Sequence, residues 1–440
     1  MPECPDPLDI LAHTPAPKLT HYLFRYPAKF HPPVARALIE RYSEPGGTIY
    51  DPFIGSGTLL VEAASAGRNG IGSDIDPLAV AIAQVKTHVF RPAQLRQSAA
   101  ALTAALAGLE RRTGGYERLQ WQDIAETTYE RRASSLRAWI PAIPNLHHWF
   151  RRYVILELAQ MKRALAEIDV PESHRAFLSI VFASIIRNAS NADPVPVSGL
   201  EVTSHMRARD AAGRVVNPHA LLRDALARSL KAATDFAEAA KAGTSQEVYL
   251  HDATRPATHV HSPVDTVITS PPYYGAVDYY RRHQLEMFWL GLTKTQADRL
   301  SLLPQYIGRP KIPMRDPLLK QDTPAGPEVA RWLEHLTKIN TKSGLSFRHY
   351  MIAMSRVFIA LAPVLTAGSP AVFVVGDSTW HGTRLPTQQL FAELAGRAFH
   401  LDEVLSYPTK NRYMSYTRHN GADIGAEYVL AFRRSTVPTP

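Results

Sequence analysis

The sequence contains almost no cysteine, since Cys4 is the only one among 440 residues. A single cysteine cannot form an intrachain disulfide or the cysteine cage of a structural zinc site. No apolar run approaches the roughly 20 residues that a membrane-spanning helix needs. The first ten residues, MPECPDPLDI, also lack the basic and then apolar pattern of a secretory signal. These absences predict a cytoplasmic protein without a membrane-embedded part.

The composition is that of a globular protein, with 45% hydrophobic and 20% charged residues. The chain is long enough for a large core, organised as two domains or as one domain with large insertions. Its formal net charge is +9, which favours a polyanionic partner. Charge alone leaves nucleic acid as one alternative, because many basic proteins bind none.

Residues 46–77, GGTIYDPFIGSGTLLVEAASAGRNGIGSDIDP, alternate between strand-forming and helix-forming segments. A strand over 48–50 precedes a glycine loop, and a helix over 58–66 leads to a second strand that ends near Asp74. Such βαβ units build parallel sheets. Further strands are predicted over residues 266–269, 371–375, 400–407 and 427–432. The expected fold class is therefore α/β with a mostly parallel sheet.

A long alanine-rich stretch with leucines at helical spacing separates the two groups of strands. Within it, residues 176–187, AFLSIVFASIIR, are apolar almost all round and predict a buried central helix. Residues 188–218 and about 294–345 are expected to be irregular, because neither stretch fits a core. The sequence thus predicts a first part of the core over 1–90, a helical insertion over 91–245 and a second part of the core over 246–440.

The glycine loop has the features of a cofactor site. Gly55 and Gly57 allow a tight turn and leave room for a ligand to approach the backbone. Asp74 follows Gly55 by 19 residues at the expected end of the second strand, where a carboxylate can bind ribose hydroxyls. Asp51 at the entrance of the loop would repel a pyrophosphate, so a positively charged nucleoside such as S-adenosylmethionine fits better. An ordinary βαβ turn, with Asp74 capping the strand end, is the structural alternative.

A second unusual segment is VDTVITSPPYYGAVDYY, residues 264–280, in which a strand ends in two prolines and several aromatics. Ser270 and Pro271 would lie at the carboxyl end of that strand, where open α/β sheets bind ligands. A serine hydroxyl beside a free proline carbonyl forms an acceptor pair for an amino group. Tyr273 offers a flat face for a planar base. The alternative is a proline-rich turn with core tyrosines.

The segments DPFIGSGT and TSPPY together resemble the S-adenosylmethionine-dependent DNA amino-methyltransferases, which modify cytosine N4 or adenine N6. FRYPAKFHP, GSDIDP and HDATRP are similar to the cofactor-binding motifs of that family. The resemblance assigns cofactor binding to Phe30, Asp51, Phe53, Gly55, Gly57, Thr58, Asp74 and Asp252. It assigns catalysis to the tetrad Ser270, Pro271, Pro272 and Tyr273.

The resemblance also implies a fold and a chemistry. The fold would be a Rossmann-like methyltransferase core in unpermuted order, with the glycine loop ahead of the tetrad. A base would leave double-stranded DNA, stack on Tyr273 and present its exocyclic amine to Ser270 and Pro271. Serine at the first tetrad position accompanies mostly cytosine N4 in this family, so a cytosine-N4 DNA methyltransferase is preferred. Adenine N6 in DNA and a base in RNA are the alternative targets.

Contacts with nucleic acid are expected at Tyr274, Arg281 and Arg282, which follow the tetrad directly. The insertion over 91–245 is a candidate region for reading the target sequence, and a cognate restriction endonuclease is a candidate partner. A nucleic-acid-binding protein with a vestigial cofactor fold is a hypothesis of another class. The intact Asp51, Asp74 and tetrad argue against it.

The histidines near residue 260 are not predicted to bind a metal. His251 and the segment HVH, residues 259–261, lie close together in the chain. No suitably spaced acidic or cysteine ligand accompanies them, so a surface or strand-end position is expected. The sequence therefore predicts no metal site.

Overall fold

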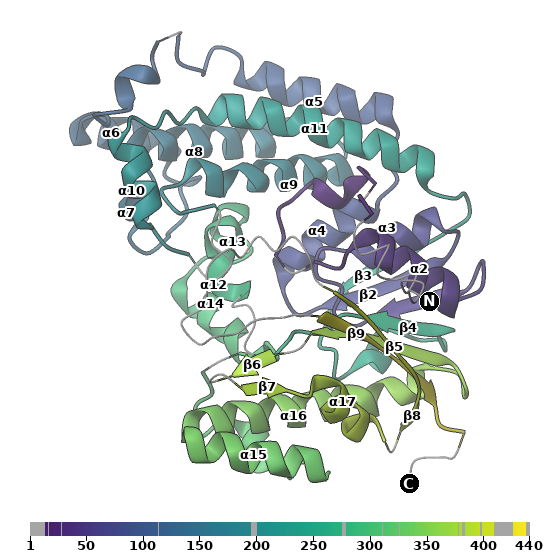
Figure 1. The fold of residues 1–440 in the computed structure, drawn as a ribbon. Helices are drawn as coiled ribbons and strands as arrows, with labels where there is room; N and C mark the ends of the chain where they lie inside the picture. The colour runs from purple at the N-terminus through teal and green to yellow at the C-terminus, as the bar shows by residue number, and fades with distance from the viewer. Residues whose placement is uncertain are drawn as a thin grey trace, which may run out of the picture.

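A computed structural model describes most of the chain, and the remaining residues, which include Cys4 and 275–278 of the proline-rich segment, lie outside it. The described residues are 14–15, 17–27, 29–112, 114–194, 200–274, 279–309, 311–324, 326–376, 378–380, 383–396, 398–408 and 426–436. Seven strands form one twisted sheet with helices on both faces (Figure 1). This is the α/β arrangement that the sequence predicts.

The strand order is β3-β2-β1-β4-β5-β9-β8. The strands are β1 (Thr48–Asp51), β2 (Asn69–Asp74), β3 (Gln246–Leu250), β4 (Thr266–Thr269), β5 (Pro370–Gly376), β8 (Phe399–Pro408) and β9 (Ala426–Arg434). The first five in this order are parallel, whereas β9 runs antiparallel to both β5 and β8. This mostly parallel sheet, with one reversed strand near its edge, agrees with the Rossmann-like core that the resemblance implies.

Successive side chains along each strand point to opposite faces of the sheet, and helices cover both faces. On one face, Ile49 and Ile268 pack with α2 (Pro32–Tyr42), α3 (Thr58–Ser65) and α4 (Pro77–Thr87). On the other face, Tyr50 and Val267 join a core with α15 (Pro327–Ile339), α16 (Thr341–Leu361) and α17 (Thr387–Ala395). Strands buried on both faces need continuous apolar runs, which is why "TVIT" of β4 contains no charged residue.

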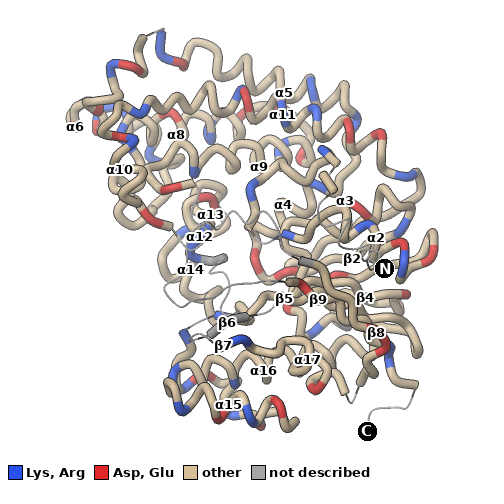
Figure 2. The backbone as a smooth tube through the Cα atoms, in the orientation of Figure 1, with Lys and Arg blue, Asp and Glu red and all other residues tan. Residues whose placement is uncertain are grey.

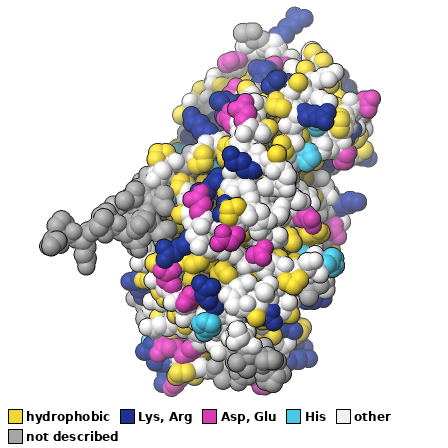
Figure 3. Space-filling view, turned by 90° about the vertical axis from the view of Figure 1, so that its right-hand side faces the viewer, with side chains coloured by type: hydrophobic (Ala, Val, Ile, Leu, Met, Phe, Trp, Pro, Cys, Tyr) yellow, Lys and Arg dark blue, Asp and Glu magenta, His cyan; other side chains and the backbone are white. Residues whose placement is uncertain are grey.

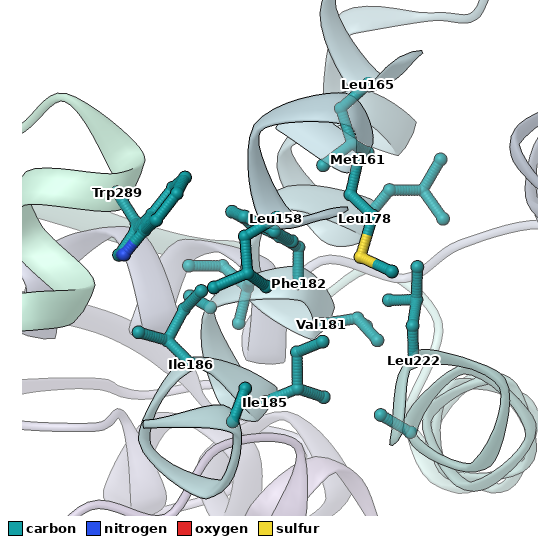
Figure 4. Packing of buried hydrophobic residues seen from close by; sticks show 14 of the residues in the cluster. Leu158, Met161, Leu165, Leu178, Val181, Phe182, Ile185, Ile186, Leu222 and Trp289 are labelled. Carbon is teal, nitrogen blue, oxygen red and sulfur yellow. The ribbon is translucent and has the colours of Figure 1, made fainter. Parts of the chain in front are cut away.

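Between α4 and β3 the chain forms a layer of helices above the sheet (Figure 1). These are α5 (Pro92–Leu106), α6 (Glu126–Ala133), α7 (Leu146–Trp149), α8 (Arg152–Glu167), α9 (Glu172–Ala189), α10 (Ser204–Ala211) and α11 (Pro218–Ala239). Helix α9 is the predicted central helix and is buried along most of its length. Its residues Leu178, Val181 and Ile185 pack against α8 and α11, and Trp289 closes the cluster from the side (Figure 4).

The shorter elements lie mainly after the tetrad. They are α12 (Tyr279–Arg282), α13 (Gln284–Leu290), α14 (Gln296–Leu302), β6 (Ser378–Trp380) and β7 (Thr383–Leu385). The 3₁₀ turns are η1 (Thr20–Tyr22), η2 (Glu117–Leu119), η3 (Ser134–Leu136), η4 (Pro256–Thr258), η5 (Leu303–Gln305), η6 (Pro317–Lys320) and η7 (Ala362–Val364). Within the described ranges, no helix combines the length and apolar character needed to cross a membrane.

Two segments differ from their predicted irregularity. Residues 188–218 contain helix α10, whose N-terminus is capped by the Thr203 hydroxyl accepting from the Met206 amide. Residues 294–345 contain α14, α15 and the start of α16. The Thr295 capping box starts α14, and a strong apolar stripe with Val329 and Leu336 buries α15. Local capping and one-sided burial therefore order segments whose composition resembles that of loops.

Candidate active site

A cleft of about 900 Å³, part of it open to solvent, lies at the carboxyl ends of β1, β2 and β4. This is the edge at which open α/β sheets bind ligands. Nine of the predicted site residues line it: Phe30, Asp51, Phe53, Gly55, Thr58, Asp74, Asp252, Ser270 and Pro272. Segments separated by about 220 residues thus meet at one site, because β1 pairs directly with β4.

The glycine loop passes from β1 to α3 in a conformation that other residues rarely adopt. Gly55 has φ = +48° and Gly57 has φ = +78°, both in the left-handed region. The Gly55 amide donates a hydrogen bond of 2.9 Å to Asp74 Oδ2, which ties the loop to the end of β2. Gly57 lies behind the cleft, where a Cβ atom would come within 2.9 Å of Ala83 Cβ. Gly57 therefore shapes the loop from behind.

Three buried carboxyl groups lie close together beside this loop. Asp51 Oδ1 accepts hydrogen bonds from the Phe53 amide at 3.0 Å and from Thr269 Oγ1 at 2.6 Å. Burial raises the pKa of Asp51 to about 7, and it also raises the pKa of Asp74. Burial and the nearby Asp74 raise the pKa of Asp76, the N-cap of α4, to about 7. Three carboxyl groups that are costly to ionise in isolation suit a cationic ligand.

Two lysines lie near the same loop. The side chain of Lys86 is fully buried, and its Nζ donates to Ser56 Oγ at 3.3 Å from beneath the loop. Burial lowers the pKa of Lys86 well below its ordinary value. Lys29 Nζ donates to the His21 carbonyl at 3.1 Å, and burial lowers its pKa to about 8. Burial therefore disfavours the charged forms of both lysines, which limits their repulsion of a cation.

The proline-rich segment is anchored from two directions. Ser270 and Pro272 face the cleft, and the Tyr350 hydroxyl of α16 donates a 2.9 Å hydrogen bond to the Pro272 carbonyl. The Tyr273 hydroxyl donates a 2.9 Å hydrogen bond to Glu427 Oε1 of β9. The first bond holds the backbone of the tetrad, and the second holds the side chain of Tyr273.

The residues expected to contact nucleic acid occupy different environments. Tyr274 is only 5% exposed, and its ring packs against Phe347 and Tyr350 while its hydroxyl donates to the Ser343 carbonyl. Arg282 is only 4% exposed. Tyr274 thus packs on Tyr350, which anchors the tetrad, and Arg282 lies in the interior. Arg281 is about half exposed and forms a 3.3 Å ion pair with Glu201.

One wall of the cleft was not anticipated from the sequence. Gln305, Tyr306 and Ile307 line it from the end of η5, within the segment expected to be irregular. Tyr26, of the segment FRYPAKFHP, lines the cleft as well and packs its ring 5.0 Å from the buried His283 ring. In the sequence, the only signal for the wall formed by residues 305–307 is the cluster of apolar and aromatic residues in "LLPQYIG".

The histidines beside the cleft pack as rings. The centroids of His251 and His259 are 4.4 Å apart, and His259 Nε2 lies 3.3 Å from the Tyr50 hydroxyl. Burial lowers the pKa of His259 to about 4. Across the part of the chain that the structure describes, no group of three or more His, Cys, Asp or Glu residues could hold a metal ion.

Comparison with known proteins agrees with this geometry. Residues 8–85 match a family model described as DNA methylase, of the N6/N4 methyltransferase type. Type II methyltransferase M.MvaI from Kocuria varians is 22% identical over 96% of this chain and 92% of its own length. Type II methyltransferase M.MjaII from Methanocaldococcus jannaschii is 36% identical over 89 residues, which are 20% of this chain and 17% of that protein.

The alignment with the solved structure of TrmN from Thermus thermophilus covers 92% of this chain and 49% of that chain, at 10% sequence identity. Its TM-score of 0.29 is too low to bear on the fold. These sequence similarities indicate an S-adenosylmethionine-dependent methyltransferase, and the sheet order and the cleft agree with one. The chain is thus similar to DNA methylases of the N6/N4 type over residues 8–85 and to a Type II DNA methyltransferase over most of its length.

The residues of the cleft fit S-adenosylmethionine. Asp74 and Asp51 provide carboxylates for a ligand that carries hydroxyl groups and positive charge. The Thr58 hydroxyl lines the cleft, is buried and has no hydrogen-bond partner within the described structure. A buried hydroxyl without a partner is unfavourable, so a polar ligand would satisfy it.

The affinity for S-adenosylmethionine is expected to fall about tenfold between pH 7.5 and 5.5, since a cation near a carboxyl stabilises only its ionised form. Asp51 has a pKa of about 7 and becomes neutral over this range. Without a cation, the raised pKa of Asp51 lowers the free energy of unfolding as the pH rises from about 4 towards 7. The reason is that Asp51 releases its proton near pH 4 in the unfolded chain and only near pH 7 in the folded one.

Calorimetric titration of the cofactor at pH 5.5, 6.5 and 7.5 measures this dependence. Asp51→Asn should bind more weakly at pH 7.5 and lose part of the pH dependence. Asp76→Asn measures the part that Asp76 contributes, because Asp76 lines the same cleft with a pKa also near 7. If the unmodified chain binds S-adenosylmethionine equally tightly from pH 5.5 to 7.5, ionisation of Asp51 is not coupled to cofactor binding.

Proposed function

We propose that the chain methylates the exocyclic N4 amine of cytosine in double-stranded DNA. The observation that carries the proposal is the position of Ser270, which lines the same cleft as Asp74 and Asp51. A serine hydroxyl at the reacting end of a cofactor cleft favours cytosine N4 by the family resemblance. Adenine N6 is the alternative target, because a hydroxyl can accept a hydrogen bond from either amine.

The tetrad would act by positioning the amine. The lone pair of an exocyclic amine is delocalised into the ring, so the nitrogen is a poor nucleophile. Hydrogen bonds from its N–H groups to Ser270 Oγ and the Pro271 carbonyl favour a more pyramidal nitrogen. S-adenosylmethionine supplies an electrophilic methyl group on a sulfonium. Orientation of the base by Tyr273 and of the tetrad backbone by Tyr350 provides most of the acceleration.

The DNA would lie across the side of the molecule that carries α12. Lys and Arg residues recur there, at α12 and towards the nearby ends of β6–β7 and α15 (Figure 2). The side at the right of Figure 1 instead mixes acidic and basic side chains (Figure 3). Arg281 is the best candidate for a phosphate contact. The helical insertion over 91–245, whose Glu201 pairs with Arg281, is the candidate reader of the target sequence.

The biological setting belongs to the same proposal. M.MvaI and M.MjaII are both described as Type II methyltransferases, a designation that suggests a restriction–modification role for this chain too. The proposed partners are double-stranded DNA and a cognate restriction endonuclease, and the proposed location is the cytoplasm. Cleavage protection of DNA methylated by this chain would identify such an endonuclease.

Incubating the purified chain with labelled S-adenosylmethionine and unmethylated DNA is expected to place the label in N4-methylcytosine after nucleoside digestion. Parallel reactions with RNA should remain unlabelled. Ser270→Ala is expected to bind the cofactor normally and to transfer label at least tenfold more slowly, because one of the two acceptors is lost. Label in N6-methyladenine would overturn the cytosine assignment, and label only in RNA would overturn DNA as the substrate. Failure to bind the cofactor would favour a vestigial fold.

A further inference from the structure

Glu427 lies beside the tetrad without being part of any motif in the sequence. It stands at the start of β9, where it pairs with Gly376 of β5 on one side and Tyr407 of β8 on the other. Its Oε1 accepts the Tyr273 hydroxyl at 2.9 Å, and its Oε2 accepts the Tyr407 hydroxyl. One carboxylate thus joins the aromatic residue of the tetrad to the reversed strands of the sheet.

The second partner holds the carboxylate in a fixed position. Tyr407 is 3% exposed and packs in the core with α2 and α3. Burial and the nearby Glu427 raise its pKa well above the ordinary value for tyrosine, so its hydroxyl remains a donor. Because Tyr407 and Glu427 are directly opposite in the ladder, their side chains leave the sheet on the same face. The Tyr407 bond therefore restricts the rotamers of Glu427.

The Tyr273 ring needs such a contact at its tip. Tyr350 anchors the backbone one residue earlier, at the Pro272 carbonyl. That bond leaves the two side-chain torsions of Tyr273 undetermined. A hydrogen bond from the phenolic oxygen to a charged acceptor fixes the far end of the ring, and bonds of this kind are about twice as strong as neutral ones. The plane of the Tyr273 ring is then fixed before a base arrives, so binding of the base costs less side-chain entropy.

We infer that Glu427 is a positioning residue that orients the Tyr273 ring for stacking on the extruded base. The inference rests on the proposed function, in which Tyr273 stacks on that base. Glu427 acts only through Tyr273 and takes no part in binding the cofactor. Its contribution should therefore affect turnover and leave cofactor affinity unchanged.

Glu427→Ala is expected to lower kcat on long unmethylated DNA about tenfold, as the loss of one hydrogen bond to a charged group would. The dissociation constant of S-adenosylmethionine should not change. Glu427→Gln keeps an acceptor oxygen and should restore most of the turnover. Tyr273→Phe removes the other half of the bond and should match Glu427→Ala.

The double variant Tyr273→Phe with Glu427→Ala separates orientation from general damage. If the two residues act through their shared bond, the double variant should be no slower than either single variant. Tyr428→Phe is the matched control, because Tyr428 is the next residue of β9, carries the same phenol and pairs with Arg384 on the opposite face. It should retain the turnover of the unmodified chain.

Wild-type turnover in Glu427→Ala, or losses that multiply in the double variant, would overturn the inference while the proposed function stands. Wild-type turnover in Tyr273→Ala would overturn the stacking role and the inference together. Alanine at 427 also leaves the buried Tyr407 hydroxyl without its acceptor, so thermal unfolding is measured alongside. If Glu427→Ala does not fold, Tyr273→Phe carries the test, and its full turnover would refute the inference.

Discussion

Replacing Tyr273 with alanine is expected to lower the rate of methyl transfer about 100-fold. Stacking of a base on an aromatic residue contributes about 1–3 kcal/mol, and a base that is no longer held in place reacts more slowly still. Cofactor binding should be unaffected, because Tyr273 does not line the cofactor cleft. Single-turnover transfer of labelled methyl groups to DNA measures the first quantity, and calorimetric titration of S-adenosylmethionine measures the second.

Tyr273→Phe provides the graded control for this experiment. Phenylalanine keeps the flat face and loses only the hydrogen bond to Glu427, so its loss should be about tenfold. The order of activities should be tyrosine, then phenylalanine, then alanine. Equal turnover in Tyr273→Ala and the unmodified chain would refute a stacking role for this residue. A parallel loss of cofactor binding would instead indicate that the tetrad and the cleft had collapsed together.

Replacing Gly57 with alanine is expected to lower the free energy of unfolding by about 2–5 kcal/mol, from left-handed strain and from overpacking combined. The new Cβ would lie 2.9 Å from Ala83 Cβ and 3.0 Å from Ala83 Cα, at φ = +78°. Because Ala83 Cα belongs to helix α4, the clash cannot be relieved by a rotamer change. The loop must shift, and binding of S-adenosylmethionine should fall at the same time.

Gly46→Ala separates the two causes. Gly46 has almost the same backbone angle, φ = +80°, but a Cβ built there meets nothing within 4 Å. This control should therefore show only the conformational cost of roughly 1–2 kcal/mol, with cofactor binding intact. Urea unfolding and calorimetric titration compare the two variants. Gly57→Ala and Gly46→Ala of equal stability and affinity would mean that the packing of Gly57 on Ala83 does not shape the loop.

The parts of the fold that sequence reasoning predicted correctly are those with strong local signals. The glycine loop and the apolar runs of β1, β4, β5 and β9 predicted strands that the structure confirms. Strand β3 was not predicted, because it lies at the edge of the sheet, where its residues Gln246–Leu250 are at least partly exposed and lack a continuous apolar run. Helices α10 and α15 were likewise missed, since a Thr203 cap begins α10 and one-sided burial of Val329 and Leu336 holds α15.

The candidate site shows the same limit. Residues at motif positions, such as Asp51, Asp74 and Ser270, meet in one cleft as expected. Their motifs specify backbone turns at strand ends, which local sequence can encode. Whether Tyr274 or Arg282 faces the solvent depends on the packing of helices distant in sequence, and both prove to be buried. Tyr306 and Glu427 approach the site through tertiary pairing alone, so spacing rules could not identify them.

The central pairing of β1 with β4 joins two strands that are synthesised far apart in time. Ile49 pairs with Thr266, so β1 waits for its second neighbour while more than 200 residues are added. At about 5–20 residues per second this takes roughly 10–40 s. During that interval the nascent chain carries β1 and β2 with an unpaired edge, the kind of edge that promotes aggregation. The helices of the insertion are made in the same interval, and their local contacts can form before β1 gains its second neighbour.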